Sequence, residues 1–216
     1  SNITVSGFSA GGRDVMAMLI SPAFRGKFQK AIVYSGGMTT SDTATAQIRI
    51  AKAIAPLAIE DGRAADEDSA RKWLLSEGDE VRAYLMEIDS ERLVPLMANA
   101  NIRMSVFPHL FEDDVVIPKG GFRGASYNGV PTIMLTGASE FSMFSLGDPW
   151  WQSDEATALS VDELAAASAF SVKYGSDMYR IFNAQESADA MADSFGEKVY
   201  VCQVDYGGDN SAMAAD

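Results

Sequence analysis

The pattern Gly-x-Ser-x-Gly, carried by Gly7, Ser9 and Gly11, lies between a short β-branched apolar run and a segment with helical spacing. A strand that turns sharply into a helix needs glycine around the serine, because larger side chains would collide there. The turn lifts the hydroxyl clear of the backbone and points the Ala10 amide and the helix N-terminus toward an oxyanion. We therefore predict a nucleophilic Ser9, an elbow at Gly7 and Gly11, and an oxyanion-hole N–H at Ala10; the alternative is an ordinary turn serine.

Buried apolar runs alternate with helical patterns along the rest of the chain, which is typical of an open α/β sheet. Strands are predicted at residues 3–7, 31–34, 132–136 and 198–204, the first three of them buried, in a mostly parallel sheet. Helices are predicted at residues 11–20, 42–55, 161–174 and 177–192, the second capped by Asp42 or Ser41 and stopped by Pro56. No linker divides the chain, so a single domain is expected.

Two stretches depart from this alternation. Residues 60–100 are charged with helical spacing, which predicts an all-helical insertion. Residues 101–129 lack periodicity and carry prolines and a glycine pair, so they are predicted to be irregular apart from a short strand at 115–117.

Composition limits the partners. The 216 residues carry a net charge of −13, which disfavours nucleic acid and anionic membrane surfaces. No apolar run approaches the roughly 20 residues of a membrane span, and the first residues show no signal-peptide pattern, so a soluble protein without its targeting region is expected. Cys202, the single cysteine, is predicted to be a core residue on a strand; no metal and no cofactor are expected.

The region around Ser9 resembles the type-B carboxylesterases, the family of the cholinesterases and para-nitrobenzyl esterases. The similar features, in order, are the elbow, Ser21-Pro22, the segment Arg25-Gly26-x-Phe28, and the strand end Ala31-Ile32-x-x-Ser35-Gly36. The resemblance implies an α/β-hydrolase fold and acyl transfer through Ser9.

Two later segments continue the resemblance. Residues 111–118 are similar to the family's D-G-x-x-x-P segment, although the glycine is missing. Residues 130–144, VPTIMLTGASEFSMF, resemble the segment that holds the triad acid, which implies that role for Glu140. The alternative for Glu140 is a charge at a helix N-terminus. Ser35 matches a serine near the triad, which implies a supporting hydrogen bond to the acid.

The triad base is not assigned within the chain. This fold places its residues in the order serine, acid, histidine, and the single histidine, His109, precedes Glu140. His109 is therefore expected to be structural, with the base beyond residue 216 and the glycine-rich oxyanion loop before residue 1. The resemblance thus implies a partial α/β-hydrolase domain over 1–216, inactive alone, that self-associates or takes a complementing chain.

The resemblance implies a small-molecule ester as substrate. Phe8 stands where many relatives carry glutamate, which favours a neutral ester over a cationic one. The alternative is an esterase-like binding or adhesion module that has lost catalysis, although the presence of Ser9 and Glu140 favours the enzyme. The cluster of Phe141, Met143, Phe144, Trp150 and Trp151 is predicted to wall a substrate pocket or to pack in the core.

Overall fold

The computed structural model describes residues 1–76, 78–96, 110–123 and 125–205, and the chain divides into two compact units. The sheet unit comprises Ser1–Met38 and Phe122–Asp216, and the helical unit comprises Thr39–Gly121. The predicted helical insertion thus forms a compact unit of its own, inserted between the second and third strands of the main sheet.

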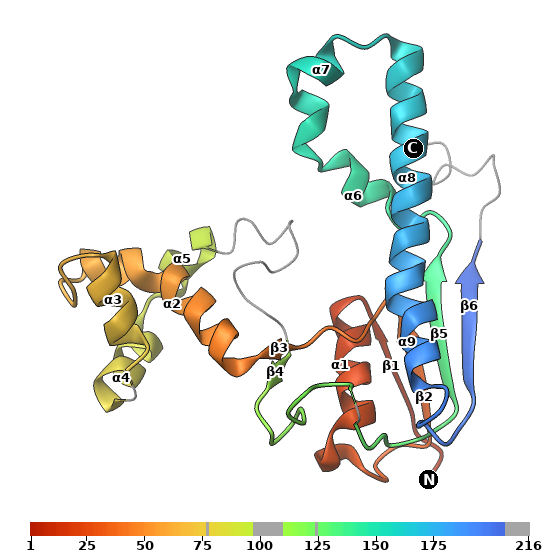
Figure 1. Cartoon of the computed structure of the whole chain (residues 1–216), viewed down its shortest axis with the longest axis horizontal. Coiled ribbons are helices and arrows are strands. Elements are labelled where there is room, and N and C mark those ends of the chain that lie inside the picture. The colour runs from red at the N-terminus through yellow and green to blue at the C-terminus, as the bar shows by residue number, and fades with distance from the viewer. Residues whose placement is uncertain (77, 97–109, 124, 206–216) are drawn as a thin grey trace. The chain divides into compact units, whose positions relative to one another are not determined.

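The sheet unit contains four parallel strands in the order β1-β2-β5-β6 (Figure 1). They span Thr4–Phe8 (β1), Lys30–Tyr34 (β2), Thr132–Gly137 (β5) and Val199–Val204 (β6). The predicted strands are confirmed with shifts of single residues at their ends. Phe8, Tyr34, Leu135 and Cys202 are partners across the sheet, so the chain leaves every strand at the same edge.

One face of this sheet is better covered than the other. The strand order advances in one direction, and right-handed crossovers then place the connecting helices on one face. Ala31, Val33 and Met134 are buried, whereas the alternate residues Ile32 and Ile133 are only half-buried.

The prediction of a buried strand is therefore wrong for β1, which is one of the two edge strands. Every second residue of β1 is exposed, and most residues of β6 are exposed along its length. Cys202 lies on β6 and is exposed, so its assignment to the core is wrong for the same reason.

The helix that follows β1 is α1, Ala10–Ile20. Its carboxyl end is held by Asn128, whose side-chain amide donates to the carbonyls of Met18 and Ser21, at 2.8 Å each. The Asn128 backbone N–H donates to the carbonyl of Leu19 at 2.6 Å. Carbonyls at a helix end lack intrahelical partners, so Asn128 ties α1 to the segment that leads into β5.

A long helical segment precedes β6. It consists of α8 (Val161–Arg180), a π-helical turn η4 (Ile181–Gln185) and α9 (Glu186–Met191). The predicted break near residue 175 is wrong, because Gly175 accommodates a ring instead of ending a helix: a Cβ there would lie 2.2 Å from Cδ1 of Phe141. The shorter helices of this unit are η1 (Pro22–Phe24), α6 (Ser142–Leu146), η3 (Pro149–Gln152) and α7 (Asp154–Thr157).

The helical unit contains α2 (Thr43–Glu60), α3 (Glu67–Leu74), α4 (Asp79–Glu87) and α5 (Ser90–Leu93). Its core consists of Ile54, Ala55, Ala58, Ala70 and Tyr84. The Tyr84 hydroxyl donates to Asp61 at 3.0 Å, and Arg92 forms an ion pair with the same carboxylate at 2.9 Å. These contacts join α2, α4 and α5, and the predicted all-helical insertion is confirmed in the residues described.

Helix α2 passes through Pro56, so the prediction that this proline ends the helix is wrong. Proline removes one helical hydrogen bond and crowds the preceding turn. Ala55 and Ala58, on either side of it, are fully buried in the core of the unit. Tertiary packing therefore outweighs the local cost. The predicted N-cap is confirmed, since the Asp42 side chain accepts from the Thr45 amide at 2.8 Å.

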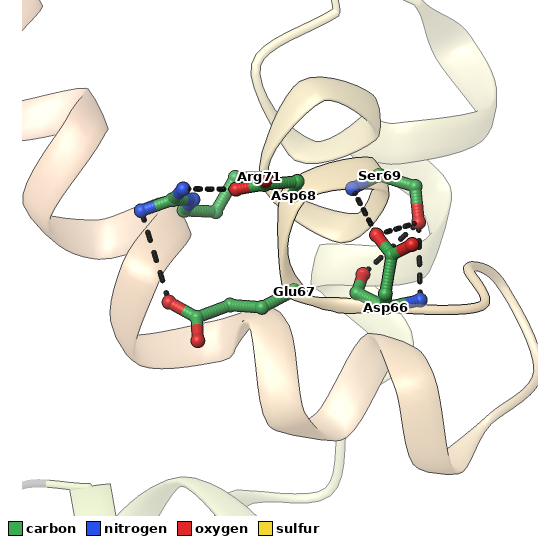
Figure 2. Close-up of polar contacts among 5 residues, drawn as sticks. All are labelled: Asp66, Glu67, Asp68, Ser69 and Arg71. Atoms are coloured by element: carbon green, nitrogen blue, oxygen red, sulfur yellow. Dashed lines mark hydrogen bonds and ion pairs between the residues drawn. The ribbon is translucent and has the colours of Figure 1, made fainter.

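Figure 2 shows the start of α3, where the acidic run at residues 66–68 has a structural role. The Asp66 side chain accepts from the Ser69 amide at 2.7 Å, and the Ser69 hydroxyl lies 3.1 Å from the Asp66 amide, which donates to it. Arg71 forms ion pairs with Glu67 and Asp68 on the same helix. Negative charge in a first turn is favourable, so the run stabilises the helix start.

Residues 113–117 form a turn instead of the predicted strand. The Asp113 carboxylate accepts from the amides of Val115, Val116 and Ile117 at 2.8–3.0 Å. The strand in this region is β4 (Phe111–Glu112), which pairs in parallel with β3 (Ser41–Asp42). Asp114, at the position where the resembled pattern has glycine, adopts a left-handed φ of 60°.

Candidate active site

Ser9 lies at the turn between β1 and α1, with φ 55° and ψ −111°. This conformation is strained for a residue with a side chain, and such strain concentrates at functional sites. The Ser9 amide donates to the Tyr34 carbonyl at 2.8 Å, so the sheet ladder continues through the turn. The structure thus places the predicted nucleophile on a strand-to-helix elbow at the carboxyl edge of the sheet.

The glycines around Ser9 differ in what they do. A Cβ at Gly7 would lie 2.1 Å from the Gly11 carbonyl oxygen, so Gly7 is required as predicted. Among the described residues, a Cβ at Gly11 would have no neighbour within 4 Å, so the collision expected at that position is absent.

The second close approach involves Gly12, which the sequence pattern missed. Its Cβ would lie 2.6 Å from the Tyr34 carbonyl oxygen, and a Cβ at Gly36 would lie 2.3 Å from the Gly12 carbonyl carbon. The doublets Gly11-Gly12 and Gly36-Gly37 are the sequence signal that could have revealed this backbone contact.

The polar groups of the elbow are available for chemistry. The Ser9 side chain does not cap α1, although serine is a common cap. Ala10 is the first residue of α1, where the N–H groups have no intrahelical acceptor and carry the positive end of the helix dipole. Hydroxyl and amide therefore lie on adjacent residues, as attack on a carbonyl and stabilisation of its oxyanion require.

Glu140 follows the end of β5 by three residues and is half-buried. Its Oε2 accepts from the Gly137 amide at 2.8 Å, which turns the side chain back toward the strand end. Because β1, β2 and β5 are parallel, Ser9 and Glu140 lie at the same edge of the sheet with β2 between them. Glu140 also precedes α6, as the alternative reading expected.

Ser35 lies at this edge as well, directly after β2, with a left-handed φ of 53°. Its amide donates to the Leu135 carbonyl at 2.8 Å, so it continues the ladder as Ser9 does. The predicted hydrogen bond from Ser35 to Glu140 is not formed: within the described part of the chain, the buried Ser35 hydroxyl has no partner. The Gly137 amide takes up the carboxylate instead.

The aromatic residues near the site combine packing and exposure. Phe8 is 64% exposed, with its ring centroid 4.8 Å from that of Tyr34. Phe141 and Phe144 are in ring contact at 5.7 Å, and the Trp151 indole donates to the Ser145 carbonyl. Met143, Phe144 and Trp150 remain exposed, so the predicted cluster is neither wholly core nor an enclosed pocket wall in this structure.

His109 lies outside the described residues. Across residues 1–76, 78–96, 110–123 and 125–205, no three His, Cys, Asp or Glu side chains gather as metal ligands would. None of the helices in those ranges is long and apolar enough to cross a membrane.

The parallel sheet, the serine elbow after β1 and the glutamate after β5 define an α/β-hydrolase fold, present as part of a domain. The sequence model described as the carboxylesterase family matches residues 1–203. The chain belongs to the carboxylesterase family. No curated protein sequence matches it.

Solved structures agree with this fold. Geobacillus stearothermophilus carboxylesterase EST55 is 24% identical with a TM-score of 0.60, and the match covers 95% of this chain and 43% of that one. A PNB esterase is 21% identical with a TM-score of 0.57, covering 97% and 45%. Juvenile hormone esterase from Manduca sexta is 16% identical with a TM-score of 0.58, covering 96% and 44%. The chain thus spans less than half the length of these structures.

Proposed function

We propose that this chain carries the nucleophile and the acid of a serine carboxylesterase. Ser9 attacks the carbonyl carbon of a carboxylic ester, and the alcohol leaves as the acyl-enzyme forms. The Ala10 amide stabilises the oxyanion, Glu140 orients the histidine that accepts the Ser9 proton, and water then releases the acid.

The observation that carries the proposal is the backbone of Ser9. A serine with a left-handed φ costs about 1–3 kcal/mol relative to an unstrained turn, and such strain clusters at functional sites. Ser9 directly precedes α1, and its side chain does not cap that helix. This is the geometry of a nucleophile elbow.

We also propose where the base lies, which part of the domain this chain forms, and which kind of ester it hydrolyses. The base is a histidine that follows Glu140 in chain order, which places it C-terminal to the described residues. Residues 1–216 act as part of a larger domain, whose other segments supply this histidine and a second oxyanion donor. The substrate is a neutral ester, because Phe8 presents an exposed ring beside the elbow instead of a charge.

Labelling with a fluorophosphonate probe tests the proposal, with intact mass as the readout. The full-length protein should gain one probe adduct, and the Ser9→Ala variant should gain none. Ser6→Ala, which changes a serine on β1 three residues before Ser9, is the control and should label as the unmodified protein does. The chain of 216 residues alone should remain unlabelled, since it lacks the base.

A folded full-length protein that the probe does not label would contradict the esterase proposal. It would favour the alternative of a binding module that keeps the fold without the chemistry.

A further inference from the structure

Helix α8 contacts the residue that follows Glu140. The Phe141 amide donates to the Ser176 hydroxyl oxygen at 2.9 Å, and Ser176 is only 1% exposed. Phe141 lies in the turn between β5 and α6, so this bond ties the site loop to a separate helix. A buried hydrogen bond of this kind restricts the backbone on the carboxyl side of Glu140.

The ring of Phe141 fits against the same turn of α8. A Cβ on Gly175 would lie 2.2, 2.4 and 2.8 Å from Cδ1, Cγ and Cε1 of Phe141. Close-packed interiors tolerate such overlap poorly, so any side chain at position 175 must displace the ring. The esterase pattern that this chain resembles has glycine after the acid, so this contact depends on the departure at Phe141.

A second bond joins α6 to α8, five residues before Ser176 on α8. The Ser145 hydroxyl donates to that of Ser171 at 2.9 Å, and Ser145 is buried. Residues 171 and 175 are four apart and lie on one face of a helix. The Ser145–Ser171 bond and the contact between Phe141 and Gly175 therefore lie on the same face of α8. The segment from Phe141 to Ser145 is thus held at its beginning and its end by α8.

We propose that α8 positions the Glu140 carboxylate through this anchor, with Gly175 and Ser176 as positioning residues; the inference rests on the proposed function. The Gly137 amide holds the carboxylate itself, and the Ser176 hydroxyl holds the backbone of the next residue, Phe141. A triad acid acts by orienting an imidazole, so its placement sets the rate of acylation. A misplacement of about 1 Å costs on the order of 100-fold in rate.

The test uses the full-length protein and its hydrolysis of para-nitrophenyl acetate. Gly175→Ala should lower kcat by about 10-fold or more with KM changed by less than about 2-fold, because the carboxylate moves while the binding surface stays. Ser176→Ala should lower kcat in the same direction. Ser168→Ala makes the same change about two turns earlier on α8 and should leave kcat unchanged.

A double-mutant cycle separates positioning from general damage. In a Phe141→Ala background, Gly175→Ala should have no further effect on kcat, because the displaced ring is gone. Thermal melting of each variant is measured alongside. If Gly175→Ala fails to fold, the kcat of Ser176→Ala tests whether α8 positions Glu140.

Three outcomes would overturn the inference. If Gly175→Ala or Ser176→Ala lowers the melting temperature but leaves kcat intact, α8 is only structural. If Gly175→Ala lowers kcat equally in the presence and absence of the Phe141 side chain, the Phe141 ring does not couple α8 to Glu140. If the unmodified protein reacts with neither ester nor fluorophosphonate, the proposed function fails first, and this inference with it.

Discussion

Two serines concentrate backbone strain at the edge of the sheet. Ser9 and Ser35 each follow a strand, adopt a left-handed φ, and donate an amide to the next strand at 2.8 Å. Each such conformation costs about 1–3 kcal/mol and persists only when its surroundings enforce it. The backbone of Gly12 approaches Tyr34 and Gly36, the residues on either side of Ser35, so closely that no Cβ fits.

Replacing the two neighbouring glycines of α1 should therefore have opposite effects. Gly12→Ala should lower the free energy of unfolding by about 1–3 kcal/mol, because its Cβ overlaps the Tyr34 carbonyl. Gly11→Ala meets no neighbour and should raise it by up to about 1 kcal/mol through helix propensity. Urea unfolding followed by circular dichroism measures both. Equal destabilisation by the two changes would contradict the assignment of the close contact to Gly12.

Helix α2 illustrates how packing controls an element against its local preference. Pro56 lies inside the helix with its ring exposed, while Ile54, Ala55 and Ala58 fill the core around it. Local preference predicts a stop at Pro56, and the buried face overrides it. The proline therefore remains as a local cost without a packing benefit.

Pro56→Ala should stabilise the helical unit. It restores one backbone hydrogen bond within α2 and removes no buried contact, so unfolding free energy should rise by about 1–3 kcal/mol. Urea titration measures the change, with Pro22→Ala as the control. Pro22 is the first residue of η1, where proline is tolerated, so that variant should gain nothing. A Pro56→Ala protein that is less stable than the original would show that the proline is needed by α2.

Several acidic groups of the helical unit have a pKa that the structure lowers. Contact with Arg92 lowers the pKa of Asp61, the Thr45 hydroxyl and amide lower that of Asp42, and backbone amides of residues 115–117 lower that of Asp113. Burial and the bond to Asp61 raise the pKa of Tyr84 to about 12. The stability of this unit therefore depends on pH at both ends of the scale.

The direction in which pH changes the stability of the helical unit follows from the linkage between ionisation and folding. The lowered carboxyl pKa values stabilise the unit above their ordinary value of 3.8, and this contribution is lost as pH falls below it. The raised pKa of Tyr84 stabilises the unit below pH 10, and that contribution is lost as pH rises toward about 12. In a variant with Trp150 and Trp151 replaced by Phe, the fluorescence of Trp73, whose ring lies 5.1 Å from that of Tyr84, measures unfolding of this unit.

Tyr84→Phe is the matched control. It should cost about 1 kcal/mol at neutral pH through the lost hydrogen bond to Asp61, and it should weaken the loss of stability between pH 10 and 12. The loss of stability at acidic pH should remain in this variant, because the carboxylates are unchanged. If Tyr84→Phe loses as much stability between pH 10 and 12 as the unmodified protein does, that loss is due to other groups.

Much of the fold could be predicted from the sequence because its signals are local. Short β-branched runs bounded by glycine or proline identified the four strands, and the pattern at Gly7, Ser9 and Gly11 located the elbow. The resemblance of residues 130–144 to the segment that holds the triad acid placed Glu140 after the strand that is β5. Each of these inferences depends only on residues close together in the sequence.

The sequence by itself therefore determined the parallel sheet, the elbow and the family, since strand and turn preferences act over a few residues. Only the tertiary structure decided which glycine of α1 is required, that Ser35 does not bond Glu140, and that α2 and α8 continue through Pro56 and Gly175. Those outcomes depend on contacts between residues far apart in the chain, where close packing outweighs local preference.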